Sequence, residues 1–425
     1  MNTIGHKETT LAAIHALPIW QQQLWESEKI NIAETYSLYG DTYPTNKKEL
    51  GPFVEFSDGT IPDFYMPKLR WKHHCDAAID YWEAPFYDKA LQTLNYFSEK
   101  IIDAIRSKDI TSAARFAGTM AHYFQDNACP GHAVDDTDLE IIKDLLPPPE
   151  HLKCAPFHPM METSPTPFSL DNYTPQLYGI TVAEASCNFI DRIVELTLNA
   201  RKAVLPFFNS FYENDEETAT KLNMGICHFA AEVYADFLNT VTCIASEQFG
   251  NSSTDSIVKK LAGTFPYRQT AWAGGNYSQV APGELNGINL NNSYEAVPCK
   301  LSYKNSEISQ TKTISNALGA TAYFEYEFKI PKETYTKLTF DYGIHADLGT
   351  LYPITFEVLC DNKCIFSDTK GTGDHASSVS LDLPANTEKL QLITNIADNI
   401  NIQRINNIPI VPTGHAVWAK PILIK

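Results

Sequence analysis

The chain lacks several features that would assign it to whole classes of protein. It has no apolar run long enough to span a bilayer, and its N-terminus shows no basic segment followed by an apolar one, which would indicate a signal peptide. It also has no Cys-x-x-Cys pair, no repeat and no low-complexity tract. These absences argue against a membrane-spanning protein and against a zinc site built from paired cysteines.

Basic residues are also scarce. Lys and Arg total 33 against 51 Asp and Glu, so the formal net charge is −18. Tight binding of duplex nucleic acid requires clustered Lys and Arg that neutralise phosphates, so we do not expect duplex nucleic acid as a partner. A phosphorylated substrate held by metal ions remains compatible with this charge, because the ions supply their own positive field.

The length and the hydrophobic pattern predict two domains. A chain of 425 residues is too long for one ordinary core, and its 44% hydrophobic and 20% charged residues are typical of globular proteins. The first 250 residues show helical periodicity, interrupted by connections rich in proline at 41–69 and 136–172. The clearest helices are expected at 86–107, 110–126, 182–205 and 216–249.

After residue 250 the apolar residues alternate with a period of two, as in β-strands. The clearest strands are expected at 321–328, 337–342, 354–359 and 389–394. We therefore predict a multidomain protein with an all-α domain at 1–250 and an all-β sandwich, jelly-roll-like, at 280–425. Residues 251–279 are expected to be a linker or the start of the second domain.

The segment from His122 to His132 is the most informative part of the helical half. His122 and Asp126 are four residues apart, so they share one face of the expected helix. Pro130 and Gly131 then turn the chain so that His132 can come back toward that face. Nitrogen and carboxylate ligands in this arrangement suit Zn²⁺. By itself, a His–Asp pair at this spacing is more often a buried polar contact beside a core histidine than a metal site.

Further histidines and carboxylates lie at helix ends or in loops of the same domain. Together with the first segment they form one candidate ligand set: His6, Asp41, His73, His122, Asp126, His132, His158 and Glu162. A single pair of ligand types has little weight. Several within the first 165 residues favour a metal centre.

The spacing of these residues resembles a known family. His122-x3-Asp126-x5-His132, preceded by His73-x2-Asp76 and followed by His158-x3-Glu162, resembles the zinc-dependent phospholipases C. Their superfamily also contains the single-strand-specific zinc nucleases of fungi and plants. The resemblance covers roughly residues 1–249. Tyr39-Gly40-Asp41 is similar to the family's Tyr-Pro-Asp turn, with Gly40 in place of proline.

The resemblance implies three zinc ions and a ligand set for each. The first ion would be held by Asp41, His73, His122 and Asp126, the second by His132, His158 and Glu162, and the third by His6, Asp126 as a bridge, and the amino and carbonyl groups of Met1. The nuclease branch has Trp at the position of Met1, but the ligand atoms there are backbone atoms. The amine can bind a metal only when no residue precedes it. We therefore expect a secreted, periplasmic or otherwise extracellular protein whose signal peptide has been removed.

Zinc ions at such a site lower the pKa of a bound water and bind the oxygens of a phosphodiester. Asp126 and Asp41 are the expected catalytic residues, with Asp41 as mixed ligand and general base; the alternative for Asp41 is an Asx-turn. We predict a phospholipase C-type zinc hydrolase acting on a phospholipid or related headgroup phosphodiester. The alternatives are a single-strand-specific zinc nuclease, or a non-catalytic protein that binds a glycan or membrane surface and retains a structural zinc cluster.

The C-terminal half carries a resemblance of its own. Gly414-His415-Ala-Val-Trp418-Ala-Lys-Pro421 is similar to the final turn, DHAxWAxP, of the β-sandwich module NPCBM, a carbohydrate-binding domain of glycan-active enzymes. This resemblance implies glycan binding through stacking of Trp418 on a sugar and hydrogen bonds from polar side chains. The candidate contacts are His415, Trp418, His345 and Asp347. The alternative is that Trp418 and His415 are buried structural residues. Peripheral membrane contact and a monomeric state are also expected.

Overall fold

The structure is a computed structural model that separates into two compact units, Met1–Ser253 and Thr254–Lys425. The described residues are 1–42, 84–134, 136–162, 165–250, 258–264, 266–271, 287–290, 295–305, 308–321, 324–396, 404–405, 408–409 and 414–425. Among them, no helix combines the length and apolar character needed to cross a membrane.

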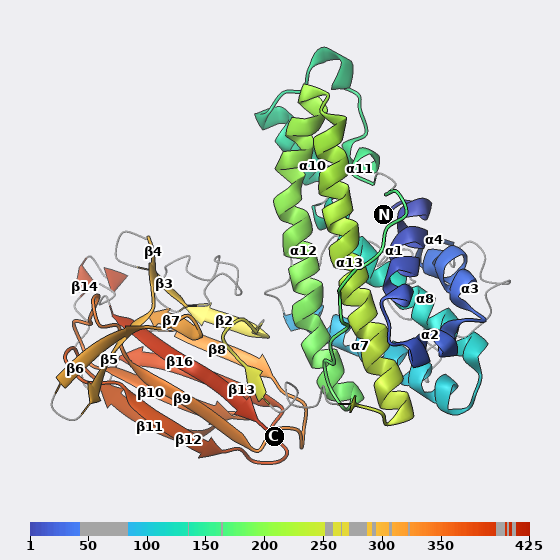
Figure 1. The fold of residues 1–425 in the computed structure, drawn as a ribbon. Coiled ribbons are helices and arrows are strands. Elements are labelled where there is room, and N and C mark those ends of the chain that lie inside the picture. The colour runs from blue at the N-terminus through green and yellow to red at the C-terminus, as the bar shows by residue number, and fades with distance from the viewer. Residues whose placement is uncertain are drawn as a thin grey trace. The chain divides into compact units, whose positions relative to one another are not determined.

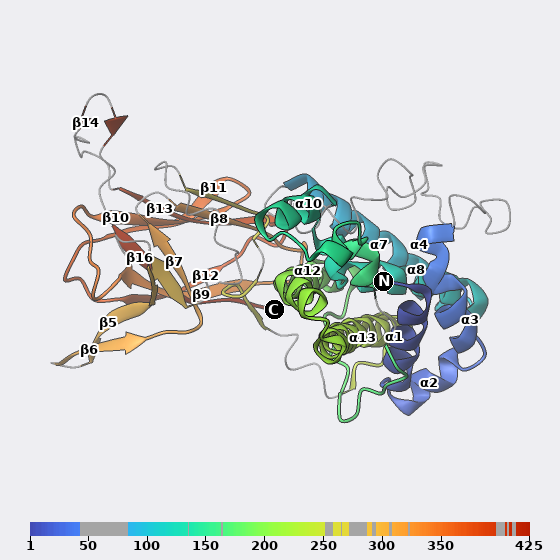
Figure 2. The ribbon, with the colours of Figure 1, turned by 90° about the horizontal axis from the view of Figure 1, so that it is seen from above.

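The first unit is all-helical in its described part (Figures 1 and 2). Its elements are α1 (Thr3–His15), α2 (Ile19–Trp25), α3 (Lys29–Glu34), η1 (Tyr36–Leu38), α4 (Tyr39–Thr42), α7 (Ala84–Arg106), α8 (Ile110–Asn127), α9 (Pro130–Ala133), α10 (Asp136–Leu145), η3 (Glu150–Leu152), α11 (Phe157–Met160), α12 (Val182–Glu213) and α13 (Glu216–Ser246). The predicted order of a helical half followed by a β-rich half is confirmed.

The two long helical hairpins end and restart in the same way. Lys108 has φ 63° and Asn214 has φ 55°, so each stops its helix with a left-handed residue. An aspartate then caps the next helix: Asp109 accepts a hydrogen bond from the Ser112 amide at 3.1 Å, and Asp215 accepts one from the Thr218 amide at 3.0 Å. These short turns make α7 and α8, and likewise α12 and α13, antiparallel neighbours.

Two predictions on helix positions were wrong. Helix α12 continues through Pro206 to Glu213, beyond the end expected at residue 205. Phe207 and Phe208 are fully buried beyond the proline, and their burial offsets the hydrogen bond that Pro206 cannot donate. The stretch 136–172, expected to be irregular, contains the ten-residue helix α10, because the prolines start only after that helix ends.

Helix α8 lies at the centre of the helical unit and carries the segment that ends in His122 and Asp126. From Ala113 onward most of its residues are buried on every face. Burial on every face requires small residues where a neighbouring backbone approaches α8. Gly118 is such a residue, because a Cβ there would lie 2.3 Å from the Cβ of Tyr36 in η1. The surrounding helices therefore hold the last two turns of α8 in a water-excluded environment.

The second unit is a β-sandwich of two antiparallel sheets (Figures 1 and 2). The first sheet contains β1 (Val258–Lys260), β16 (His415–Ile424), β9 (Lys337–Ile344) and β12 (Ser377–Asp382) in that order, with β7 (Ala317–Thr321) also paired to β16. The second sheet has the order β11 (Lys363–Lys370), β10 (Ile354–Cys360), β13 (Lys389–Ile396), β8 (Phe324–Lys329) and β2 (Arg268–Ala271).

Three two-stranded hairpins complete the described part of this unit. They are β3 (Ile288–Leu290) with β4 (Ala296–Pro298), β5 (Lys300–Asn305) with β6 (Ile308–Thr313), and β14 (Arg404–Ile405) with β15 (Ile408–Pro409). The strand expected at 321–328 begins at Phe324, because β7 ends at Thr321 on the other sheet. β1 and β2 place part of the 251–279 segment within the sandwich.

The core of the sandwich explains the period-two pattern. Alternate residues of β10, namely Ile354, Phe356, Val358 and Cys360, are buried between the sheets. Trp418 on β16 packs against Phe340 of its own sheet and Phe356 of the other, with ring centroids 5.2 and 5.1 Å apart. Its side chain is 0% exposed. Trp418 therefore offers no face to a sugar, and the prediction that it stacks on a glycan was wrong.

We expect Trp418→Ala to destabilise the sandwich by about 3–5 kcal/mol, because it removes a large side chain shared by both layers. The measurement is urea unfolding of the full chain followed by circular dichroism. Leu351→Ala is the matched control, because Leu351 is 73% exposed in the same unit. The control should change the free energy of unfolding by no more than about 0.5 kcal/mol. Equal effects of the two substitutions would contradict a core role for Trp418.

Candidate metal centre

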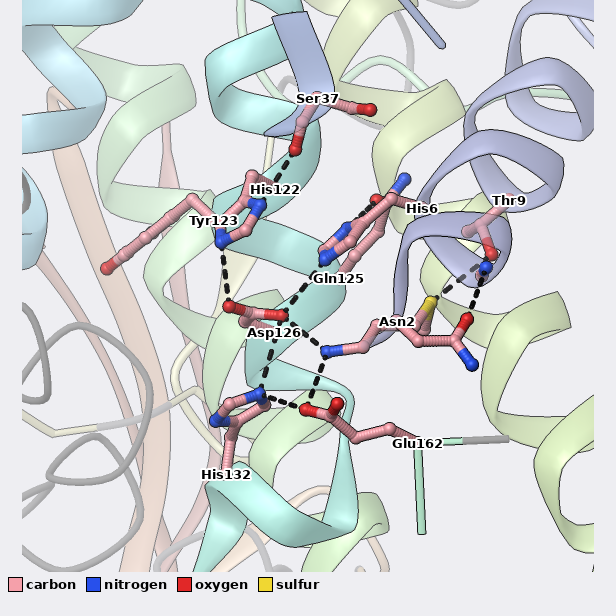
Figure 3. Close-up of polar contacts among 12 residues, drawn as sticks. Asn2, His6, Thr9, Ser37, His122, Tyr123, Gln125, Asp126, His132 and Glu162 are labelled. Carbon is pink, nitrogen blue, oxygen red and sulfur yellow. Dashed lines mark hydrogen bonds and ion pairs between the residues drawn. The ribbon is translucent and has the colours of Figure 1, made fainter. Parts of the chain in front are cut away.

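Seven of the candidate ligands come together in the helical unit, although they lie up to 161 residues apart in sequence. Figure 3 shows His6, His122, Asp126, His132 and Glu162 among them. His122 and Asp126 project from the last turns of α8, and His6 from α1. His132 comes from α9 and His158 from α11, while Glu162 lies two residues after the end of α11. The amine of Met1 completes the group.

Asp126 is the central acceptor of this group (Figure 3). Its Oδ1 lies 2.7 Å from the Met1 amine nitrogen, 3.4 Å from His6 Nε2 and 3.7 Å from His132 Nε2. Its Oδ2 lies 2.9 Å from His122 Nε2. The carboxylate therefore faces four nitrogen groups while only 3% exposed. Such a position fits a carboxylate that bridges neighbouring cations.

Glu162 forms a second focus beside the first. Its Oε1 lies 2.9 Å from His132 Nε2, 3.4 Å from His158 Nε2 and 3.4 Å from the Met1 amine. The rings of His132 and His158 meet edge to face at a centroid distance of 4.7 Å. Since His132 and the Met1 amine contact both carboxylates, the two foci form one continuous cluster.

Hydrogen bonds on the far side of two imidazoles determine how the rings face Asp126. The Nδ1 of His122 donates to the Ser37 carbonyl at 2.7 Å, and the Nδ1 of His6 donates to Gln125 Oε1 at 2.6 Å. The Gln125 amide nitrogen donates to Thr10 Oγ1 at 2.8 Å, which sets the amide orientation. Both rings therefore carry a proton on Nδ1, the arrangement typical of metal-binding histidines.

The protonation of Nδ1 bears on whether the cluster around Asp126 can hold a cation. With Nδ1 protonated and the ring neutral, His6 Nε2 directs a lone pair toward Asp126 Oδ1 at 3.4 Å, whereas His122 Nε2 lies at hydrogen-bond distance, 2.9 Å, from Asp126 Oδ2. His6 Nε2 is buried and has no hydrogen-bond partner among the residues that the structure describes. A buried polar atom without a partner is destabilising, and a cation between imidazole nitrogen and carboxylate oxygen would satisfy both. The donor set of imidazole nitrogens and carboxylate oxygens fits Zn²⁺.

The protonation states of the cluster suit metal ligands. Burial, reinforced by the charges of His122 and the Met1 amine, holds the pKa of His6 well below its usual value. Burial likewise lowers the pKa of His132. Burial by itself raises the pKa of Asp126, but His122 and the Met1 amine outweigh it and hold that pKa well below the usual range. Neutral imidazoles and an ionised carboxylate are the forms that coordinate metals.

The Met1 amine differs from these groups in the absence of a metal. Burial by itself lowers its pKa, but the negative charges of Asp126, Cys129 and Glu162 outweigh burial and raise that pKa to about 12. The amine is therefore protonated in the cation-free cluster, where it compensates the buried carboxylates. It would have to lose that proton to become a metal ligand.

Gly40 brings the chain next to Asp41 into contact with the cluster. A Cβ on Gly40 would lie 2.2 Å from His122 Cδ2 and 2.4 Å from His122 Nε2. Only glycine, which has no Cβ, allows α4 to approach the imidazole this closely. Glycine at position 40 is therefore a requirement of this packing. The side chain of Asp41, and all of His73 and Asp76, lie outside the described residues.

Sequence reasoning missed Cys129. Its Sγ lies within 4.8 Å of ligand atoms of His132 and Glu162, and the three residues form one of two groups able to hold a cation among the described residues. The other group is His6, His122 and Asp126. Cys129 stands three residues after Asp126 and three before His132, so a ligand type at this spacing was the available signal.

The remaining candidate sugar contacts are mostly structural. His345 is buried, its Nε2 donates to the Pro298 carbonyl at 2.9 Å, and its Nδ1 accepts from the Asp347 amide at 3.2 Å. His415 is also buried. Direct sugar contacts by these two imidazoles were therefore wrong predictions. Asp347 is exposed and pairs with Lys300 at 2.6 Å, so its glycan contact stays a prediction.

Comparison with known proteins gives matches among solved structures only. No family model matches the chain, and no curated protein matches it. The alpha-toxin from Clostridium absonum aligns with 100% of this chain and 98% of its own at 11% identity, with a TM-score of 0.35. The alpha-toxin from an avian strain of Clostridium perfringens aligns with 99% of this chain and 91% of its own at 10% identity, with a TM-score of 0.32.

Carbohydrate-binding modules match part of the chain. The M60 catalytic domain of Clostridium perfringens ZmpB with two CBM51 domains aligns with 40% of this chain at 14% identity and a TM-score of 0.29; the chain spans 15% of that structure. The CBM51 of Clostridium perfringens GH95, in complex with methyl-galactose, covers 39% of this chain and 99% of its own at 15% identity, with a TM-score of 0.28. TM-scores this low do not assign a function to this chain.

We expect Gly40→Ala to displace the His122 ring and to lower the zinc content of the purified protein, because the added methyl group has no space. Such overpacking typically costs about 1–3 kcal/mol. Gly225→Ala is the control, since Gly225 is exposed on α13 and a Cβ there would meet nothing within 4 Å. Alanine there should stabilise the helix by up to about 1 kcal/mol. Zinc per chain and thermal unfolding measure both effects; unchanged zinc in Gly40→Ala would contradict the close contact.

Proposed function

We propose that the chain is a zinc-dependent phosphodiester hydrolase of phospholipase C type. The observation that supports this most strongly is the meeting of Met1, His6, His122, Asp126, His132, His158 and Glu162 in one buried cluster. Each was a candidate ligand from the sequence, and chance would not bring residues from five separate segments onto two carboxylates.

The ligands divide among three proposed ions. His122 and Asp126 would hold the first together with Asp41 and His73. His132, His158 and Glu162 would hold the second. His6, Asp126 and the Met1 backbone would hold the third. Asp126 belongs to two of these sets. This is possible because its two carboxylate oxygens face different nitrogen groups: Oδ1 faces the Met1 amine and His6, and Oδ2 faces His122.

Bound zinc ions would lower the pKa of a water molecule and neutralise charge on the phosphodiester oxygens. The residues of the chain orient the metal ligands and exclude bulk water from them. Ser37 and Gln125 orient the imidazoles of His122 and His6, and the burial of Asp126 excludes bulk water and strengthens its interactions. We propose that the carboxylate of Asp41 accepts the proton of the attacking water, and that Asp126 holds the adjacent ligand nitrogens in place.

The proposed substrate is a phospholipid or related headgroup phosphodiester. A net charge of −18 disfavours long polyanions, so single-stranded nucleic acid is the weaker candidate. We further propose that the protein acts outside the cytoplasm and that its β-sandwich contacts a glycan or a membrane surface. That contact would not use Trp418, which belongs to the core.

We expect His122→Ala and Asp126→Asn each to lower hydrolysis of a chromogenic phosphocholine ester roughly 100-fold or more, because each removes a ligand and exposes uncompensated charge. Zinc per chain should fall in parallel, and circular dichroism should report an intact helical fold. His151→Ala is the control, since His151 is an exposed histidine of the same unit. Full activity in either ligand variant would refute the proposal. Stoichiometric zinc without hydrolysis in the wild type would favour the non-catalytic alternative.

A one-residue extension tests the role of the Met1 nitrogen. Adding Gly before Met1 converts the amine into an amide, which cannot coordinate as an amine does and carries no charge toward Asp126. We expect the extended protein to bind fewer zinc ions per chain than a protein that begins at Met1. The same glycine added after Lys425 is the control and should leave zinc content unchanged. Equal zinc content in all three proteins would show that the Met1 nitrogen is not a ligand.

A further inference from the structure

The buried thiol of Cys129 is the feature of the cluster that the proposed function does not use. It is 2% exposed, and its sulfur lies within 4.8 Å of ligand atoms of His132 and Glu162, which themselves lie within that distance of each other. His158 Nε2 lies 3.4 Å from the same Glu162 oxygen that His132 approaches. One imidazole, one carboxylate and one thiol therefore lie close enough to share a cation, and the His158 imidazole lies beside the same carboxylate.

The backbone holds Cys129 rigidly between proposed ligands. Its amide donates to the Asp126 carbonyl at 3.0 Å, and its carbonyl accepts from the His132 and Ala133 amides, each at 3.0 Å. Pro130 then begins α9 directly after it. Because Cys129 is tied to Asp126 on one side and His132 on the other, its sulfur has a defined position beside the Glu162 focus.

Other buried cysteines of the same unit have a different environment. The thiol of Cys227 contacts Asn223 Oδ1 at 3.9 Å, and that of Cys243 contacts Asn239 Oδ1 at 3.6 Å, both within α13. Cys243 Sγ also accepts a hydrogen bond from the Gln21 amide at 3.4 Å. Neither belongs to a group of cation ligands among the described residues. Burial alone makes a cysteine a small hydrophobic residue, but convergence with His132 and Glu162 distinguishes Cys129.

We propose that Cys129 is a thiolate ligand of the cation held by His132, His158 and Glu162. This inference rests on the proposed zinc centre and assigns one of its ions a different role. Sulfur as a fourth donor closes a tetrahedral zinc site, and closed sites are structural whereas hydrolytic sites keep a position for water. The attacking water therefore belongs to the ions around Asp126, and the Glu162 ion holds α9 and α11 together. A thiolate also makes this site prefer soft divalent ions over magnesium or calcium.

Cobalt substitution tests the thiolate directly, with a readout other than activity. The full-length protein is stripped of metal and titrated with Co²⁺, and a thiolate-to-cobalt charge-transfer band is recorded in the near ultraviolet. We expect the band in the wild type and its loss in Cys129→Ser, which keeps the size of the side chain. Cys227→Ser is the matched control and should keep the band, because Cys227 lies outside the cation groups found among the described residues. Bound cobalt per chain is measured for each protein.

The outcomes separate the two proposals. Cobalt bound by the wild type without a charge-transfer band overturns the thiolate assignment and leaves the zinc centre standing, and this result needs no variant. A band that persists in Cys129→Ser also overturns the assignment. No cobalt bound by the wild type refutes the zinc centre itself. If Cys129→Ser does not fold, Cys129→Ala takes its place and should bind cobalt without the band. If neither variant folds, the presence or absence of the band in the wild type decides the question.

Discussion

A buried carboxylate is the constraint on which the helical unit depends. Asp126 is almost fully enclosed, and an uncompensated charge in that position would cost several kcal/mol. The protonated Met1 amine, 2.7 Å from Oδ1, and His122 Nε2, 2.9 Å from Oδ2, provide its closest compensation, and the imidazoles of His6 on α1 and His132 on α9 face the same carboxylate. The paths of these elements are therefore set by the requirement that their nitrogens reach one carboxylate. A cation between the ligands would relieve the same constraint, which is why the fold and the proposed chemistry have a common centre.

Glycines give the ligand groups the space that they need. A Cβ on Gly5 would lie 2.4 Å from Met1 Cγ, one on Gly40 would lie 2.2 Å from the His122 ring, and one on Gly131 would lie 2.8 Å from the His158 ring. Three of the elements that surround the cluster thus approach it through a residue without a side chain. These glycines are part of the construction of the centre, although none of them carries a ligand atom.

In the β-sandwich, a sequence motif similar to that of a carbohydrate-binding module has a packing role. The Trp418 motif is similar to that of a carbohydrate-binding module, yet the ring fills the space between the sheets. Lys420 has φ 49°, and the pairing of β16 with β9 shifts between Ala419 and Ile422. Pro421 is therefore accommodated at a bulge, where a missing amide hydrogen does not interrupt the ladder. The motif determines how β16 bends.

Local pattern was enough to predict the helical half and the period-two strands, because periodicity acts over a few residues. The candidate ligands that meet in the cluster were named partly from their spacing and partly from a family resemblance. His122 and Asp126 could be paired from the sequence alone, since one helix turn brings them together. Long-range packing decided the rest. The stacking of His6 on His122, the position of Cys129 beside Glu162, the continuation of α12 through Pro206 and the burial of Trp418 all depend on contacts between distant segments, and no local pattern encodes those contacts.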